Sequence, residues 1–170
     1  TELGEANTIV LPVNVGYAGG LNAGIRFALA HGADFLWLLT KDLTVEPNCL
    51  EELHALWPKL ENPAFLGSLT DLNGSEDVYF HQARVDGAGR IRHGVRGRKI
   101  SQIPELREAF GTTDYVNGAC VFTSKEVIER VGLIPEEYFL YFEDSDWGLR
   151  ANRMGYHNYV SYRSRVHHHR

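Results

Sequence analysis

Residues 34–47 read DFLWLLTKDLTVEP, and this stretch of sequence indicates the class of fold. Residues 34–39 are almost continuously apolar after the first position, which is typical of a strand that is covered on both faces of a sheet. Asp42 follows directly after this strand, and Pro47 lies near the start of a predicted amphipathic helix. Ligands of open α/β sheets collect just beyond the carboxyl ends of the strands. Asp42 is therefore a candidate functional carboxylate.

Strands and helices alternate on both sides of this stretch, with one excursion into a hairpin over residues 78–95. The predicted strands are residues 8–13, 34–39, 64–69, 114–122 and 156–162. Such an alternation predicts a mostly parallel sheet within a three-layer α/β/α fold. At 170 residues, we expect the whole range 1–170 to form a single domain.

Residues 14–24 read NVGYAGGLNAG and separate the first predicted strand from a helical stretch over residues 25–31. A glycine-rich loop at this place lets backbone N–H groups approach a ligand and directs a helix N-terminus toward it. The glycine spacing matches neither the dinucleotide-binding fingerprint nor the phosphate-binding loop. Glycines that only shape a tight strand-to-helix turn remain an alternative explanation.

Residues 137–150 read EYFLYFEDSDWGLR, in which an aromatic run leads directly into three carboxylates. The pattern predicts a helix that begins at these carboxylates, where the helix dipole favours negative charge. An apolar entry to clustered acids suits a pocket in which a carboxylate acts as a base or holds a cation. Alternatively, Asp144 is a helix cap and Asp146 a favourable acid of the first turn.

The overall composition limits the classes of function. Hydrophobic residues make up 44%, charged residues make up 23%, and the net charge is −5. These values are ordinary for a globular protein, and they give no reason to expect a nucleic-acid partner. A basic stretch over residues 84–99 either meets an anionic ligand or is simply solvated. Two cysteines and no apolar run that could span a bilayer favour a cytoplasmic protein, with peripheral contact at the inner face of the membrane left open.

Taken in order, three segments resemble family 2 glycosyltransferases with the GT-A fold, most closely the rhamnosyltransferase-like members. They are NVGYAGGLNAG at residues 14–24, LLTKDLTVEP at residues 38–47, and the long segment over residues 117–150 that ends in EDSDWGLR. Gly155, Tyr156 and the histidines at the end of the chain match the family pattern of a late histidine after a strand. The resemblance spans nearly the whole chain.

The resemblance implies a nucleoside-diphosphate sugar at the carboxyl edge of the sheet, with Mg²⁺ or Mn²⁺ bridging its diphosphate. By position, Asp42 and His167 would bind this metal, and Asp144 would take the proton from the acceptor hydroxyl. Positions that match the family's substrate-binding segments are Asn14, Gly16, Gly20, Asn22, Asn117, Gly118, Ala119, Glu143 and Asp146. Lys41 stands where many members carry an acid, so the metal dependence stays open.

The implied reaction moves a sugar, with inversion, to a hydroxyl of a saccharide or lipid-linked acceptor during polysaccharide or glycolipid assembly. Family members usually open with a βαβ unit that grips the nucleobase, and the sequence supplies no such unit. We therefore expect an N-terminally truncated member, in which a homodimer partner could cover the incomplete sheet. The alternative is a non-catalytic carbohydrate- or nucleotide-binding remnant of such an enzyme.

Overall fold

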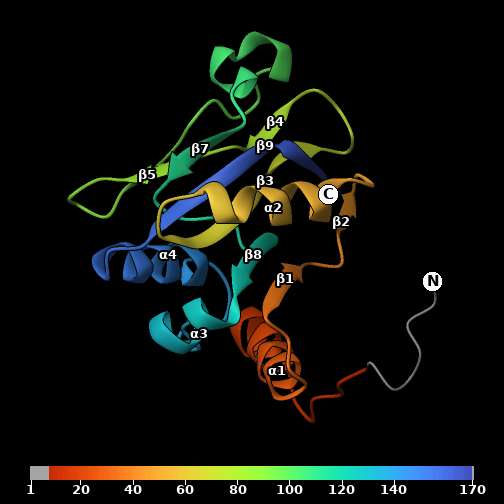
Figure 1. Ribbon diagram of the computed structural model, residues 1–170, viewed down its shortest axis with the longest axis vertical. Coiled ribbons are helices and arrows are strands. Elements are labelled where there is room, and N and C mark those ends of the chain that lie inside the picture. The colour runs from red at the N-terminus through yellow and green to blue at the C-terminus, as the bar shows by residue number, and fades with distance from the viewer. Residues whose placement is uncertain (1–7, 170) are drawn as a thin grey trace.

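A seven-stranded sheet forms the centre of the computed structural model, which describes residues 8–169 (Figure 1). The strand order is β1-β8-β3-β9-β2, with β4 paired to β3 and β7 paired to β9. The bounds of these strands are β1 Phe35–Leu39, β2 Leu43–Val45, β3 Pro63–Leu72, β4 Val78–Phe80, β7 Phe110–Thr113, β8 Cys120–Ser124 and β9 His157–His168. A separate two-stranded hairpin consists of β5 Ala83–Val85 and β6 Ile91–His93.

Helices cover both faces of the sheet, as the sequence predicts. The helices are α1 Gly16–Ala30, α2 Cys49–Leu56, α3 Lys125–Val131 and α4 Glu143–Arg153, with short 3-10 turns at Trp57–Lys59, Ile100–Gln102 and Pro104–Arg107. Successive strand residues point to opposite faces. Phe65 accordingly packs in the cluster that α1, α3 and α4 share, whereas Leu66 packs with Leu53 of α2. Figure 1 shows α2 lying across β3 and β9 in front of the sheet. The three-layer arrangement is therefore present.

The sheet is mixed, and the expected predominance of parallel pairs does not hold among the described strands. Only β3 and β9 pair in parallel in this part of the chain. β8 lies between β1 and β3 and runs antiparallel to both of them. The alternation of strands and helices along the sequence does not reveal such an insertion, because it does not say which strands become neighbours.

Two segments near the start of the described chain differ from their predictions. Residues 8–13 form no strand, and the side chains of Val10 and Val13 are 85% and 66% exposed. Helix α1 begins at Gly16, nine residues before the predicted start at residue 25, so most of the glycine-rich segment is helical. The Oδ1 atom of Asn14 accepts a hydrogen bond of 2.9 Å from the backbone N–H of Gly16 at this start.

Two later segments refine the predictions. The turn at residues 86–89 joins β5 to β6 as expected, whereas β4 leaves the predicted hairpin and pairs with β3. The predicted strand over residues 114–122 is a strand only from Cys120 onward. The preceding turn is closed by Asn117 Oδ1, which accepts a hydrogen bond of 2.9 Å from the N–H of Ala119. Within residues 8–169, no helix is both long enough and apolar enough to span a bilayer.

Candidate functional site

A cleft of about 910 Å³ opens at the end of β1 and beside the first turn of α4. Six parts of the chain line it: the start of α1, the end of β1 with the turn after it, β4, the turn before β8, the first turn of α4 with the segment that leads into it, and the end of β9. Eight of the predicted site residues line this cleft, namely Gly16, Gly20, Asp42, Asn117, Gly118, Ala119, Glu143 and Asp144. The carboxylates Asp42 and Asp144 thus meet in one cleft although they are far apart in the sequence.

The other four predicted site residues do not line the cleft, namely Asn14, Asn22, Asp146 and His167. Asn22 is fully buried, and its side-chain amide donates hydrogen bonds of 2.8 Å to the Ile134 carbonyl and to Glu136 Oε1. Its Oδ1 atom accepts a hydrogen bond of 3.1 Å from the Ile134 N–H, so Asn22 joins α1 to the loop before α4. Asn14 binds the N–H of Gly16, and Asp146 does not line the cleft.

The structure places His168, and not His167, beside Asp42. The distance from His168 Nε2 to Asp42 Oδ2 is 3.6 Å. The Nδ1 atom of His167 instead lies 2.8 Å from Oδ2 of Asp71, a fully buried carboxylate. Consecutive strand residues point to opposite faces of a sheet, so the side chains of His167 and His168 lie on opposite sides of β9. The predicted pairing of Asp42 with His167 is therefore not what the structure shows.

The Asp144 carboxylate is held by backbone N–H groups at the start of α4. Its Oδ2 accepts a hydrogen bond of 3.1 Å from the Gly118 N–H, and its Oδ1 accepts one of 2.7 Å from the Ser145 N–H. Burial raises the pKa of Asp144, and these two hydrogen bonds oppose that shift. Burial also raises the pKa of the neighbouring Glu143, whose Oε2 is buried and has no hydrogen-bond partner within residues 8–169. A carboxylate with a raised pKa is suited to accept a proton.

Tyr17 connects the start of α1 to two other segments at the cleft, a role that the sequence did not reveal. Its hydroxyl donates a hydrogen bond to the Gly118 carbonyl, and its backbone N–H donates one of 3.0 Å to the Phe139 carbonyl. Burial raises the pKa of Tyr17, so the hydroxyl remains a donor. A Cβ atom on Gly118 would lie only 2.6 Å from the Tyr17 hydroxyl oxygen, which explains why glycine is needed at that position.

The sequence profile of Glycosyl transferase family 2 matches residues 3–132, which is more than half of the sequence. The chain belongs to glycosyl transferase family 2. This family 2 chain is 24% identical over 144 residues to the low-salt glycan biosynthesis hexosyltransferase Agl10 of Haloferax volcanii, a match that covers 82% of the chain and 44% of the relative. It is 25% identical over 154 residues to the dTDP-rhamnosyl transferase RfbF of Shigella flexneri, covering 91% of the chain and 49% of the relative. The family 2 chain therefore spans about half the length of the curated relatives it matches.

A solved structure supports the expected GT-A fold. The crystal structure of GalNAc-T7 with UDP, GalNAc and Mn²⁺ aligns with a TM-score of 0.72 over 94% of the family 2 chain and 31% of that protein. The two sequences are 14% identical over this match, so the likeness concerns the fold alone.

Asp42 and His168 offer two free ligand atoms to a cation. Asp42 Oδ1 and His168 Nδ1 are both buried and form no well-formed hydrogen bond within the described chain. The nearby Thr40 side chain lowers the pKa of Asp42, and His168 contributes to the same shift. No group of three or more His, Cys, Asp or Glu side chains in residues 8–169 could hold a metal ion. A carboxylate oxygen and an imidazole nitrogen are nevertheless both ligand types that a divalent cation accepts.

Proposed function

We propose that the family 2 chain forms the catalytic part of an inverting glycosyltransferase that uses a nucleoside-diphosphate sugar. The observation that carries this proposal is the single cleft in which Asp144, a buried acid with a raised pKa, faces the same space as Asp42 and His168. The family assignment and the names of both curated relatives, a hexosyltransferase and a rhamnosyl transferase, support sugar transfer as the reaction.

Asp42 and His168 would hold Mg²⁺ or Mn²⁺ on the donor side of the cleft. Such a cation neutralises negative charge on a leaving diphosphate. Lys41 also lines the cleft and places a second positive charge on this side. The donor sugar itself would lie against Gly118 and Ala119 of the turn before β8, with Asn117 closing that turn.

Asp144 would serve as the catalytic base. The acceptor hydroxyl oxygen attacks the anomeric carbon, its proton passes to the Asp144 carboxylate, and the bond from that carbon to the diphosphate oxygen breaks with its electron pair. A single direct displacement of this kind inverts the anomeric configuration. Glu143, which also lines the cleft, would contact the acceptor.

The acceptor would be a saccharide or a lipid-linked saccharide. Leu140 and Tyr141 line the cleft together with Asp144, and they are 52% and 70% exposed. Aromatic and apolar side chains at the mouth of a cleft suit the apolar face of a sugar ring. We place the reaction in polysaccharide or glycolipid assembly, in keeping with the glycan-biosynthesis name of one relative.

The substitution Asp144→Asn in the full-length protein tests the proposal. We expect loss of sugar transfer, with donor binding measured by calorimetry retained, because the amide keeps the shape but cannot accept the proton. Asp146→Asn is the matched control, since it removes an acid from the same helix turn outside the cleft. Unchanged transfer in Asp144→Asn would remove this residue from the mechanism. A wild-type protein that binds donor but transfers no sugar would instead support a non-catalytic remnant.

A further inference from the structure

A stack of side chains extends from the Asp42–His168 pair to Arg96, which belongs to the basic stretch over residues 84–99. The His168 ring stacks on Tyr79 of β4, with 4.9 Å between ring centroids and 21° between ring planes. The guanidinium carbon of Arg96 lies 4.5 Å from the centroid of the same Tyr79 ring. Both His168 and Tyr79 line the cleft. Arg96 therefore stacks on a ring that lines the cleft, although Arg96 is not itself one of the lining residues.

Arg96 differs from Arg84, Arg90 and Arg92 in having no ion pair with an acid within residues 8–169. Arg90 and Arg92 both pair with Asp86, at 3.0 and 3.7 Å, and Arg84 pairs with Asp114 at 3.0 Å. Within residues 8–169, no carboxylate lies within 4.0 Å of the Arg96 guanidinium, which lies over the Tyr79 ring. Stacking on an aromatic ring orients a guanidinium and leaves its N–H donors available.

The charge of Arg96 also reaches the part of the cleft around Asp144. Burial is the main cause that lowers the pKa of His93, Arg96 adds to this effect, and Asp144 opposes it. Burial likewise raises the pKa of Tyr115, Asp144 adds to this shift, and Arg96 opposes it. Arg96 and Asp144 thus affect the pKa values of the same two side chains in opposite directions.

We propose that Arg96 binds phosphate oxygens of the donor diphosphate, and that Tyr79 is a positioning residue that holds both the Arg96 guanidinium and the His168 ring. The inference rests on the proposed function and adds a protein cation to the diphosphate site. A guanidinium matches phosphate oxygens with two parallel hydrogen bonds. Lys41 lies beside Asp42 at a position where many family members are expected to carry an acid. Compared with such members, this site has less negative charge to bind a cation and more positive charge to bind the diphosphate directly.

Calorimetric titration of the full-length protein with inorganic pyrophosphate in the presence of Mn²⁺ tests the inference without requiring the nucleoside. We expect Arg96→Ala to weaken pyrophosphate binding about 10- to 100-fold, as for the loss of a charge-assisted hydrogen bond. Arg96→Lys should recover part of this loss, because it keeps the charge without the planar pair of donors. Tyr79→Leu, which removes the ring that both Arg96 and His168 stack on, should also weaken pyrophosphate binding.

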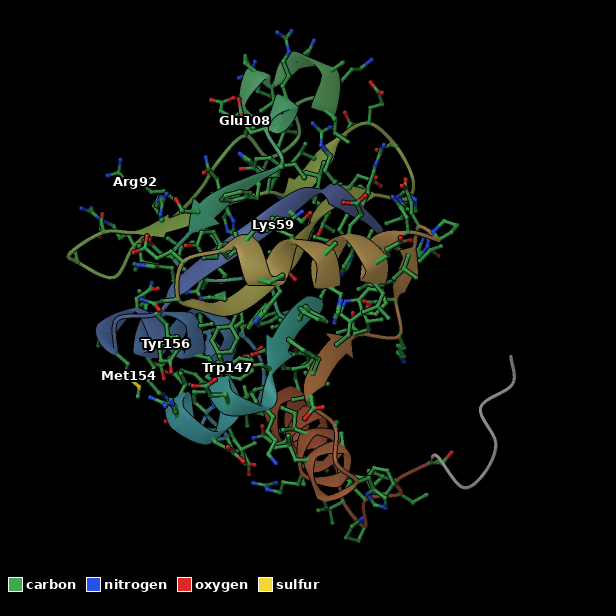
Figure 2. The ribbon with its side chains drawn as sticks, in the orientation of Figure 1. Lys59, Arg92, Glu108, Trp147, Met154 and Tyr156 are labelled. Atoms are coloured by element: carbon green, nitrogen blue, oxygen red, sulfur yellow. The ribbon has the colours of Figure 1, made fainter. Side chains whose placement is uncertain are left out.

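Arg92→Ala is the matched control, because it removes the same charge from the same basic stretch. Figure 2 shows Arg92 projecting outward, and its side chain is 74% exposed. Equal pyrophosphate affinity in Arg96→Ala and Arg92→Ala, with both variants folded by circular dichroism, would overturn the inference. Weakened binding of Arg96→Ala to phosphatidic acid vesicles with unchanged pyrophosphate affinity would also overturn it, by placing Arg96 on an acceptor phosphate.

Asp42→Asn separates the inference from the proposed function. If Asp42→Asn loses Mn²⁺-dependent pyrophosphate binding and Arg96→Ala does not, only the role of Arg96 fails. If Asp42→Asn binds Mn²⁺ and pyrophosphate as the wild type does, the proposed metal site fails, and the effect of Arg96→Ala alone then decides the inference.

Discussion

Asp42 Oδ2 and His168 Nε2 lie 3.6 Å apart, although the two residues are 126 positions apart in the sequence. The pairing of β2 with β9 fixes this relationship, since Leu43 is opposite His168 and the His169 N–H donates a hydrogen bond of 2.9 Å to the Asp42 carbonyl. The geometry of the proposed cation site is therefore set by strand register and not by a local loop.

The first prediction concerns the two neighbouring histidines. His168→Ala should weaken Mn²⁺ binding by at least about 10-fold, because it removes one of two protein ligands beside the cleft. His167→Ala should leave Mn²⁺ binding nearly unchanged and lower the stability, because His167 binds the buried Asp71 carboxylate at 2.8 Å. Titration calorimetry with Mn²⁺ and thermal unfolding measure the two effects. If His167→Ala weakened Mn²⁺ binding and His168→Ala did not, His167 would be the metal ligand instead.

The second prediction concerns the contact between Tyr17 and Gly118. Tyr17→Phe removes the hydroxyl that donates to the Gly118 carbonyl and leaves a partly buried acceptor unpaired. We expect the free energy of unfolding to fall by about 1–3 kcal/mol. Gly118→Ala should lower the free energy of unfolding by at least as much, since its Cβ atom would lie 2.6 Å from the Tyr17 oxygen. Urea unfolding measures both variants, and wild-type stability in Gly118→Ala would contradict the described packing.

The double variant Tyr17→Phe with Gly118→Ala sharpens this test. Because Tyr17→Phe removes the oxygen that the new methyl group meets, the double variant should lose less stability than the sum of the two single losses. Additive losses would mean that the two positions do not contact each other as described.

The third prediction is a pH dependence that follows from the raised pKa of Asp144. The proposed base works only when it is ionised, so the transfer rate should rise with pH through a pKa above that of an ordinary aspartate. The folded state favours the protonated acid, so the stability contribution of Asp144 is fully present below its unfolded pKa. It is then lost as the pH rises through the raised folded pKa.

Unfolding measured from acidic to neutral pH can isolate this contribution. Relative to Asp144→Asn, which does not titrate, the wild type should lose free energy of unfolding as the pH rises. A pH-independent difference between the two proteins would show that the pKa of Asp144 is not raised by folding.

Several features of this fold could be read from the sequence because they depend on local pattern. The apolar run after Asp34 became β1, and Asp42 follows it into the cleft as the strand-end rule predicts. Residues 8–13 have an equally good strand composition but form no strand, because a strand needs a neighbour and composition does not supply one. The sequence could not show that His168 lies beside Asp42 in place of His167, since the direction of each side chain depends on the register of β9 against β2.

The role of Asn22 was also beyond the reach of the sequence. An asparagine in a glycine-rich segment suits substrate binding, and only the packing of α1 against the loop at residues 134–136 turns its amide inward. Buried polar groups with several protein partners stabilise the fold, and they are not available to a ligand.

The fourth prediction uses this distinction between structure and binding. Asn22→Ala leaves the buried N–H and carbonyl of Ile134 without their partner, so the free energy of unfolding should fall by about 2–4 kcal/mol. Asn14→Ala should cost less than about 1 kcal/mol, because it removes an exposed hydrogen bond at the helix start. If Asn22 only stabilises the fold, the folded fraction of Asn22→Ala should bind pyrophosphate and Mn²⁺ with wild-type affinity at a temperature well below its transition. A selective loss of that affinity without a loss of stability would restore Asn22 to the binding site that the sequence predicted.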